Sequence, residues 1–275
     1  MYDTHIGLKR SLAEGSSFAT ARRFLSRSTA AIRAAACYLA GAGCDLLYPP
    51  RCVLCRADLP AEHHVSMLCP QCLSRLAPET WIGCRRCGGE LSGEKLVSDR
   101  CPMCKNCRLW FDTVVVLGSY HAGLNDVVVR MKRPHYEALS IAMGRLLANR
   151  RHAALVDLEA DFLLPIPMHW TRWLARGVNS PELVASCLSR VLRVPVRRRI
   201  LARRRRTAPQ RDLSPAARFR NLAGAFRVRR RAKLRGARVL LVDDILTTGA
   251  TCSEAAKMLK QAGAAMVAVA VVARA

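Results

Sequence analysis

The chain has 275 residues, of which 51% are hydrophobic, and this composition excludes a disordered protein. Its length suffices for one substantial α/β core and a smaller module. The 45 Lys and Arg residues outweigh the 20 Asp and Glu residues, so the net charge of +25 favours polyanionic partners. The excess is concentrated in three arginine-rich runs, at 197–199, 203–206 and 227–231. A solvated arginine-rich surface is the alternative interpretation of each run.

Residues 1–48 are predicted to form a basic helical segment, because apolar residues between 18 and 47 recur at helical spacing. Residues 1–36 are rich in Arg, Ser and Ala but lack the apolar core and cleavage pattern of a signal peptide. No apolar run in the sequence approaches the roughly 20 residues that a membrane span needs. We therefore expect a cytoplasmic protein without a membrane span.

Residues 49–110 carry four Cys-x-x-Cys pairs, which predict a double zinc ribbon. Thirteen residues separate the two pairs of each half, and the second half repeats the first with an offset of 32 residues. Two such turns can surround one zinc ion with four thiolates, a closed shell typical of structural sites. Disulfides are the alternative, but this pattern in a long cytoplasmic chain favours metal. The predicted ligands are Cys52, Cys55, Cys69 and Cys72 in the first ribbon, and Cys84, Cys87, Cys101 and Cys104 in the second.

Other metal ligands are conceivable in both ribbons. Cys107 lies close enough in sequence to compete with Cys101, although the repeated spacing favours Cys101. His63 and His64 stand between the first two pairs and are alternative ligands, or an exposed pair in a loop.

Residues 111–275 have the pattern of an α/β domain. Apolar, Val-rich runs predict buried strands, and 3.6-residue periodicity predicts amphipathic helices. The predicted strands are 113–117, 162–165, 239–242 and 265–272, and the predicted helices include 124–131 and 138–147. A connecting loop or hood is expected over 208–225.

The most informative stretch is RVLLVDDILTTGATCSEA, residues 238–255. A buried strand ends at Asp243 and Asp244, the end of an α/β sheet at which ligands bind. The polar loop 247–251 then leads into a helix, whose N-terminal N–H groups and Thr hydroxyls suit a phosphate. An ordinary strand, turn and N-capped helix is the alternative, but adjacent acids at a strand end are costly unless a ligand, a metal or a dipole uses them.

This order is similar to the signature of the type I phosphoribosyltransferases, which bind 5-phosphoribosyl-1-pyrophosphate (PRPP). The resemblance implies that Asp243 and Asp244 bind the ribose hydroxyls and that Mg²⁺ accompanies PRPP. It further implies a pyrophosphate-binding loop after strand 162–165, with Arg172 and Arg176 as candidates; two arginines on an exposed helix are the alternative. The residues implied for the 5-phosphate are Thr247, Thr248, Gly249, Ala250 and Thr251.

Three segments together resemble the ComF family of competence-associated phosphoribosyltransferase-like proteins: PIPMHWTRWLARGVNSPELVA, TAPQRDLSPAARFRNLAGAF and VLLVDDILTTGAT. That family also has two N-terminal zinc ribbons, and the similarity runs from about Arg51 to the C-terminus. One departure is that Val178 and Ser180 replace the aromatic and the amide of the family's Arg-Gly-Phe-Asn-Gln. The expected fold is therefore α/β, a type I phosphoribosyltransferase-like parallel sheet flanked by helices and preceded by a small tandem zinc-ribbon module.

The resemblance implies binding of Mg-PRPP and a link to DNA uptake in natural competence, with the acceptor and catalysis itself left open. The competing hypothesis is a non-catalytic competence factor that binds single-stranded DNA through the ribbons and arginine clusters, with Trp81, Trp110 and Phe111 as stacking candidates. A DNA-uptake helicase is another candidate partner. A third hypothesis is a regulatory protein that senses PRPP.

Overall fold

The computed structural model describes residues 43, 48–77, 80–91, 101–105, 107–121, 123–205, 207, 214–230 and 232–275. The predicted N-terminal helical segment, residues 1–48, therefore lies almost wholly outside the described residues. The chain divides after Pro50 into two units, and every helix and strand named below belongs to the second unit, Arg51–Ala275.

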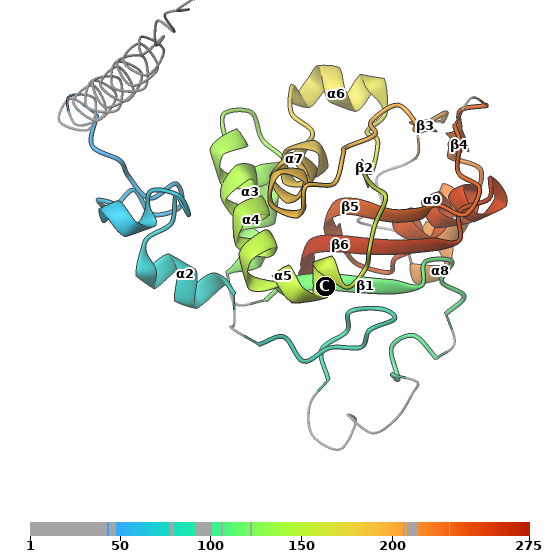
Figure 1. Ribbon diagram of the computed structural model, residues 1–275, viewed down its shortest axis with the longest axis horizontal. Coiled ribbons are helices and arrows are strands. Elements are labelled where there is room, and N and C mark those ends of the chain that lie inside the picture. The colour runs from blue at the N-terminus through green and yellow to red at the C-terminus, as the bar shows by residue number, and fades with distance from the viewer. Residues whose placement is uncertain are drawn as a thin grey trace, which may run out of the picture. The chain divides into compact units, whose positions relative to one another are not determined.

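A four-stranded parallel sheet forms the centre of this unit (Figure 1). The strand order is β1 (Thr113–Ser119), β6 (Met266–Arg274), β5 (Arg238–Leu246) and β2 (Phe162–Pro165). Runs of Val, Leu and Ala build these strands, as expected of a parallel sheet covered on both faces. Strand β2 has the predicted bounds and β5 extends beyond both predicted ends, whereas β6 begins one residue later and ends two residues later than predicted.

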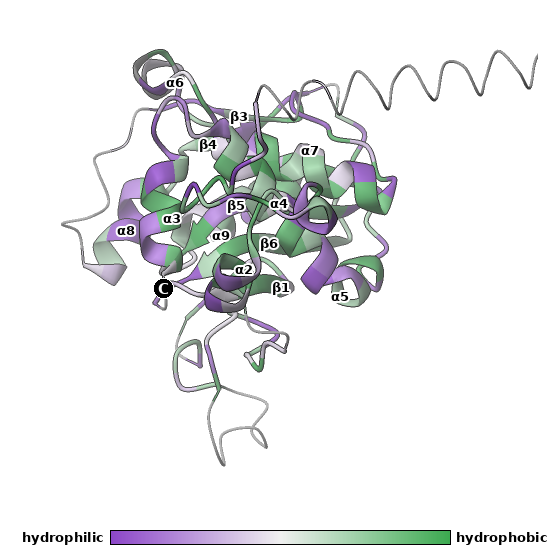
Figure 2. Ribbon diagram, turned by 90° about the vertical axis from the view of Figure 1, so that its left-hand side faces the viewer, coloured by the Kyte–Doolittle hydropathy of each residue, from purple (hydrophilic) through white to green (hydrophobic). Residues whose placement is uncertain are grey.

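The two faces of the sheet are buried in two separate hydrophobic clusters, because neighbouring strand residues point to opposite faces. One cluster joins Leu240 and Val242 of β5 to helices α3 (Leu124–Met131), α4 (Glu137–Arg150), α5 (His152–Val156) and α7 (Ser180–Leu192). The other joins Val239 and Leu241 to helix α9 (Ala250–Gln261). In Figure 2 the hydrophobic colour of β5 and β6 lies between these helices.

A small antiparallel sheet stands beside the main one and consists of β3 (Leu201–Arg203) and β4 (Phe226–Val228). The connection between these strands contains helix α8 (Pro215–Leu222), where the sequence predicted a loop. The Ser214 hydroxyl accepts a hydrogen bond from the backbone N–H of Ala217 and caps this helix, and Pro215 occupies its first turn.

The basic segment after β2, for which the sequence left a loop and an exposed helix open, is helix α6 (Trp170–Arg176). The His169 side chain accepts a hydrogen bond from the N–H of Thr171 at its start, and Gly177 ends it with φ of 68°. Helix α6 stands out from the sheet in both views (Figures 1 and 2).

The two ribbons join different hydrophobic clusters of the core. The first contains a 3₁₀ turn (Ala61–His63) and helix α2 (Pro70–Leu76), and its buried Leu68 and Leu76 join the cluster of α3 and α4. In the second ribbon, Cys87 and Cys101 join the cluster of α9. Repeated segments of one tandem module therefore support different halves of the α/β core.

None of the helices in the described part of the chain combines the length and the apolarity that a bilayer crossing needs.

Candidate functional site

Strand β5 continues through both acidic residues and ends at Leu246, beyond the predicted end at Val242. Because neighbouring residues of a strand point to opposite faces, the two carboxylates have different surroundings. Asp244 faces the end of α3, where its Oδ2 lies 3.4 Å from the ammonium of Lys132. Asp243 faces α9, where the thiol of Cys252 donates to its Oδ2 at 3.8 Å.

Lys132 is a site residue that the sequence analysis did not assign. It follows α3 directly and is half-buried, and its partner Asp244 is 8% exposed. In the sequence Lys132 is a basic residue between a predicted amphipathic helix and Pro134. This position does not indicate that its partner lies on a distant strand.

The acid pair is electrostatically strained. Burial raises the pKa of Asp243 to about 7, and the charge of Asp244 adds to the effect. Three groups oppose the rise: the N–H of Asp244, which donates to Asp243 Oδ1 at 2.9 Å, and the cations of Lys132 and Arg203. Burial also raises the pKa of the Cys252 thiol, which therefore stays protonated and remains a donor to Asp243. Such a carboxyl pair is suited to a ligand or a metal that favours its ionised form.

The small antiparallel sheet of β3 and β4 brings Arg203 toward the acid pair. Its guanidinium donates to the Oγ1 of Thr207 at 2.5 Å and lies 5.5 Å from the centre of the Phe226 ring. From the sequence, Arg203 was recognisable only as part of an arginine-rich run. Its position near Asp243 depends on the pairing of β3 with β4, which no local sequence pattern predicts.

The predicted phosphate loop, residues 247–251, joins β5 directly to the N-terminus of α9. Gly249 is the N-cap of α9, with a positive φ of 77° that favours glycine. The N–H of Ala250 donates to the hydroxyl of Thr248 at 3.4 Å. The pocket between this loop and Asp243 encloses about 10 Å³, enough for roughly one water molecule and too small to enclose a phosphate.

The two predicted pyrophosphate ligands both belong to α6. Arg172 is in the first half of this helix, and Arg176 is its last residue and is half-buried. Among the contacts of the described residues, none joins Arg176 to Asp243 or Asp244.

The departure from the family's Arg-Gly-Phe-Asn-Gln falls on packing residues. Val178 is 5% exposed and Ser180 is 2% exposed, and the Ser180 hydroxyl donates to the carbonyl of Met131 at 2.8 Å. Both side chains are thus buried, and that of Ser180 links the start of α7 to the end of α3.

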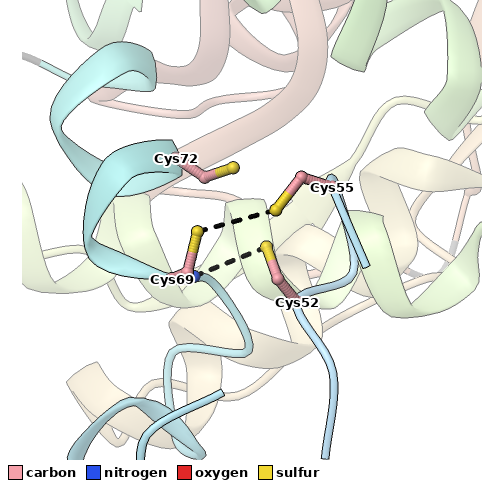
Figure 3. Close-up of side chains that lie close together, drawn as sticks. All are labelled: Cys52, Cys55, Cys69 and Cys72. Atoms are coloured by element: carbon pink, nitrogen blue, oxygen red, sulfur yellow. Dashed lines mark hydrogen bonds between the residues drawn. The ribbon is translucent and has the colours of Figure 1, made fainter. Parts of the chain in front are cut away.

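The first Cys cluster has the geometry of a tetrathiolate zinc site (Figure 3). Cys52 and Cys55 come from one turn, and Cys69 and Cys72 from the start of α2; their four sulfurs lie within 4.8 Å of one another. Sulfurs at the corners of a tetrahedron with Zn–S bonds of about 2.3 Å are ~3.8 Å apart, and Cys55 and Cys69 are separated by 3.6 Å. Although burial raises the pKa of Cys52, hydrogen bonds from the N–H groups of Cys55 and Cys69 outweigh it and lower that pKa to about 6.

The second cluster repeats this arrangement with Cys84, Cys87, Cys101 and Cys104. The sulfurs of Cys84 and Cys104 are 3.8 Å apart, and those of Cys87 and Cys101 are 3.6 Å apart. The backbone bridges of the two turns, 51–58 and 83–90, also differ by 32 residues. Cys107 lies outside the cluster and donates to the carbonyl of Met103 at 3.7 Å. The side chain of His64 hydrogen-bonds to the Leu59 carbonyl instead of joining the first cluster.

Comparison with known proteins follows the same division of the chain. Residues 43–108 match the family described as double zinc ribbon domain, and residues 182–275 match the phosphoribosyl transferase domain. Competence protein F of Haemophilus influenzae is 30% identical over 222 residues, which cover 78% of this chain and 92% of that protein. The chain belongs to the ComF family.

A second relative agrees with this assignment. DNA utilization protein YhgH of Escherichia coli O6:H1 is 31% identical over 226 residues, or 81% of this chain and 96% of that protein. A glutamine PRPP amidotransferase from B. subtilis, solved with ADP and GMP, aligns over 55% of this chain and 27% of its own, with 21% identity and a TM-score of 0.31. The fold predicted for this ComF-family chain is confirmed, and two zinc-binding sites, each with four cysteine ligands, are supported.

The aromatic residues predicted to stack on bases are partly or fully buried in the structure of this family member. Phe111 is 2% exposed and belongs to the core, so its assignment as a stacking platform is wrong. Trp110 is half-buried, with Arg108 and Lys257 at 4.9 and 5.9 Å from its ring centre. Two aromatic residues that were not predicted as stacking candidates, Trp170 and Trp173 on α6, are 66% and 53% exposed.

Proposed function

We propose that this protein binds Mg-PRPP at the carboxyl end of β5. The observation that carries the proposal is the contiguity of Asp243 and Asp244 with a loop that ends in the positive-φ N-cap of α9. Carboxylates suit ribose hydroxyls and Mg²⁺, and the N–H groups of a helix N-terminus suit a phosphate. Residues 247–251 would hold the 5-phosphate.

The cations near this edge would neutralise the pyrophosphate. Arg172 and Arg176 are proposed for this role from the family resemblance, and Lys132 and Arg203 are added because their charges act on the acid pair. If transfer occurs, the bond between the anomeric carbon and pyrophosphate breaks through an oxocarbenium-like state. Bound Mg²⁺ would supply charge neutralisation, while Asp243 and Asp244 orient the ribose.

The names of the relatives support a role in DNA uptake or natural competence. We further propose a cytoplasmic location, since two clusters of four cysteines without disulfides are typical of a reducing compartment. In this proposal residues 49–110 support the structure, and residues 111–275 bind the ligand.

Calorimetric titration with PRPP, with and without Mg²⁺, tests the binding site directly. Wild type is expected to bind in a Mg²⁺-dependent manner, and Asp243→Asn to lose this binding. Asp126→Asn is the matched control, because Asp126 forms only a solvent-exposed ion pair with Arg130. If folded, zinc-loaded wild type binds no PRPP, the proposal is wrong.

A second candidate function, binding of single-stranded DNA, is favoured by an arginine-lined cleft of about 700 Å³. The cleft lies between the segment before β3 and the segment after β4, and positive charge in such a groove suits a nucleic-acid backbone. Its lining residues are Val196, Arg197, Arg198, Arg199, Ile200, Arg229, Arg230 and Ala232.

The exposed Trp170 and Trp173 of α6 offer faces for base stacking. Fluorescence anisotropy with a labelled oligonucleotide tests this second candidate. Replacement of both Arg229 and Arg230 by Gln should weaken binding and reduce its salt dependence by about one unit of log–log slope for each phosphate that is no longer neutralised. Equal affinity of wild type and variant at all salt concentrations would exclude the cleft.

A further inference from the structure

Arg274, the last residue of β6, connects the second zinc ribbon to the candidate phosphate loop. It is 9% exposed. Its Nε donates to the carbonyl of Cys87 at 2.8 Å, and its Nη1 donates to the carbonyls of Leu246 and Thr247 at 3.0 and 2.6 Å. One guanidinium thus holds a zinc-ligand residue at one end and the entry of the loop at the other. Hydrogen bonds from a charged donor are stronger than neutral ones, and Arg presents its donors in a rigid plane.

The ribbon turn that supplies the Cys87 carbonyl is hydrogen-bonded to the edge strand β1. The carbonyl of Arg85 accepts hydrogen bonds from the N–H of Val114, at 2.8 Å, and from the Thr113 hydroxyl, at 3.0 Å. Gly88 follows with φ of +69°, and a Cβ there would lie 2.5 Å from a methyl carbon of Val116. The corresponding position of the first ribbon is Arg56, also with positive φ. Glycine in the second ribbon therefore permits a close approach to β1 that a side chain would prevent.

The chain that leaves the second ribbon supports the other side of the same loop. Leu109 and Phe111 are the nearest neighbours of a Cβ built at Gly249, at 3.2 and 3.5 Å. The Ser253 hydroxyl, in the first turn of α9, accepts from the N–H of Trp110 at 3.1 Å. The loop is thus contacted on one side by Arg274, which also binds the second ribbon, and on the other by the segment that follows that ribbon in the chain.

The first ribbon provides an internal comparison. Its buried residues pack with α3 and α4, and the guanidinium of Arg145 on α4 donates to its Val65 carbonyl at 2.6 Å. Among the described residues, no hydrogen bond joins the first ribbon to residues 246–253.

We propose that Arg274 is a positioning residue through which the folded second zinc ribbon holds the phosphate loop in its binding geometry. When zinc leaves this ribbon, the Cys87 turn comes away from β1, Arg274 loses one of its partners, and the loop opens. Loss of zinc from the first ribbon has no such route to the loop. Zinc occupancy of one ribbon thereby controls ligand affinity at a site that contains no zinc. This inference rests on the proposed function only where it concerns PRPP.

Amide hydrogen exchange of residues 246–253 in the full-length, zinc-loaded protein is the first test. Arg274→Met should raise exchange in this segment at least about tenfold, because it removes charge-assisted hydrogen bonds to the last carbonyl of β5 and the first carbonyl of the loop. Arg274→Lys, which keeps a cationic donor, should restore part of the protection. Arg151→Met is the matched control: Arg151 is 8% exposed and donates to the carbonyls of Val116 and Leu117 in β1. An equal rise in both Met variants would show general loosening and overturn the proposal.

Selective loss of one zinc is the second test, and it remains decisive if Arg274→Met does not fold. Cys84→Ser, in the second ribbon, should raise exchange at 246–253, whereas Cys55→Ser, in the first, should leave it unchanged. The opposite order, or no change in either variant, would contradict the proposal.

PRPP titration of the same proteins separates this inference from the proposed function. Affinity in Cys84→Ser is expected to fall at least about tenfold, in line with the loss of loop order. If wild type binds no PRPP, the proposed function fails while the exchange experiment still decides the role of Arg274.

Discussion

The ammonium of Lys132 lies 3.4 Å from the carboxylate of Asp244, although one residue follows α3 and the other belongs to β5. Asp244 is 8% exposed, so its charge has little water to stabilise it. The lysine therefore offsets part of the negative charge of the acid pair before any ligand is present.

Replacement of Lys132 by Met should destabilise the protein by about 1–3 kcal/mol, because a buried carboxylate loses its partner. Urea unfolding measures this loss. Lys233→Met is the control for removal of a positive charge, since Lys233 is exposed. In the double variant with Asp244→Asn much of the loss should be recovered; a strictly additive double variant would contradict the coupling.

Local sequence patterns were sufficient to predict the core strands and the helices α3 and α4. Strand β2 was predicted with its observed ends because Pro165 and the flanking polar residues limit a short apolar run. Strand β5 extends past its predicted end because Ile245 and Leu246 pair with β6 beyond the two acids. That pairing is a tertiary contact, which outweighs the local signal of two charged residues.

The predicted acid pair and loop were recognisable because their residues are adjacent in sequence. Lys132, Arg203 and Arg274 were not assigned, since each reaches the site from a different element and its partners are carbonyls or carboxylates far away in the chain. The identical spacing of the two ribbons likewise gave no indication that they join different hydrophobic clusters. The difference is visible in the sequence as Gly88, where the first repeat has Arg56. Its consequence can be recognised only in the structure, where Gly88 lies against β1.

The raised pKa of Asp243 predicts that the contribution of this residue to the free energy of unfolding falls as pH rises. Burial and the charge of Asp244 raise its pKa to about 7, so between about pH 4 and 7 the folded chain holds a proton that the unfolded chain has released. This stabilising contribution is complete at low pH and is lost as pH rises through 7. The difference in free energy of unfolding, Asp243→Asn minus wild type, should therefore increase by about 2–3 kcal/mol from pH 5 to pH 8.

Urea unfolding of wild type and Asp243→Asn at several pH values measures this difference. Both proteins carry the same ribbons, so the acid sensitivity of the thiolates cancels in the comparison. Parallel pH profiles would mean that Asp243 titrates near its ordinary value. Because Mg²⁺ favours the ionised pair, binding of Mg-PRPP at pH 6 should also release close to one proton, measurable by calorimetry in buffers of different ionisation enthalpy.

Replacement of Gly249 by Ala tests the geometry of the phosphate loop. The φ of 77° costs an L-residue about 1–2 kcal/mol, and the new Cβ would lie 3.2 Å from Leu109. Gly236→Ala is the matched control, because Gly236 has a φ of 76° and open space around its Cβ position. The Gly249 variant should lose more stability than the control, and it alone should bind PRPP at least about tenfold more weakly. Equal effects of both substitutions would show that the loop tolerates the side chain.

Zinc content decides between Cys101 and Cys107 as the fourth ligand of the second ribbon. Wild type purified without chelators should contain about two zinc ions per chain, one for each closed thiolate shell. Cys101→Ser should lower this number to about one, because Cys101 lies within the sulfur cluster and its oxygen replacement is a poor zinc ligand. Cys107→Ser should keep both ions, since the Cys107 thiol points to the carbonyl of Met103 instead. Elemental analysis of the three proteins gives the answer directly: a zinc ion lost from Cys107→Ser but retained in Cys101→Ser would reverse the ligand assignment and break the repeat of 32 residues that relates the two ribbons.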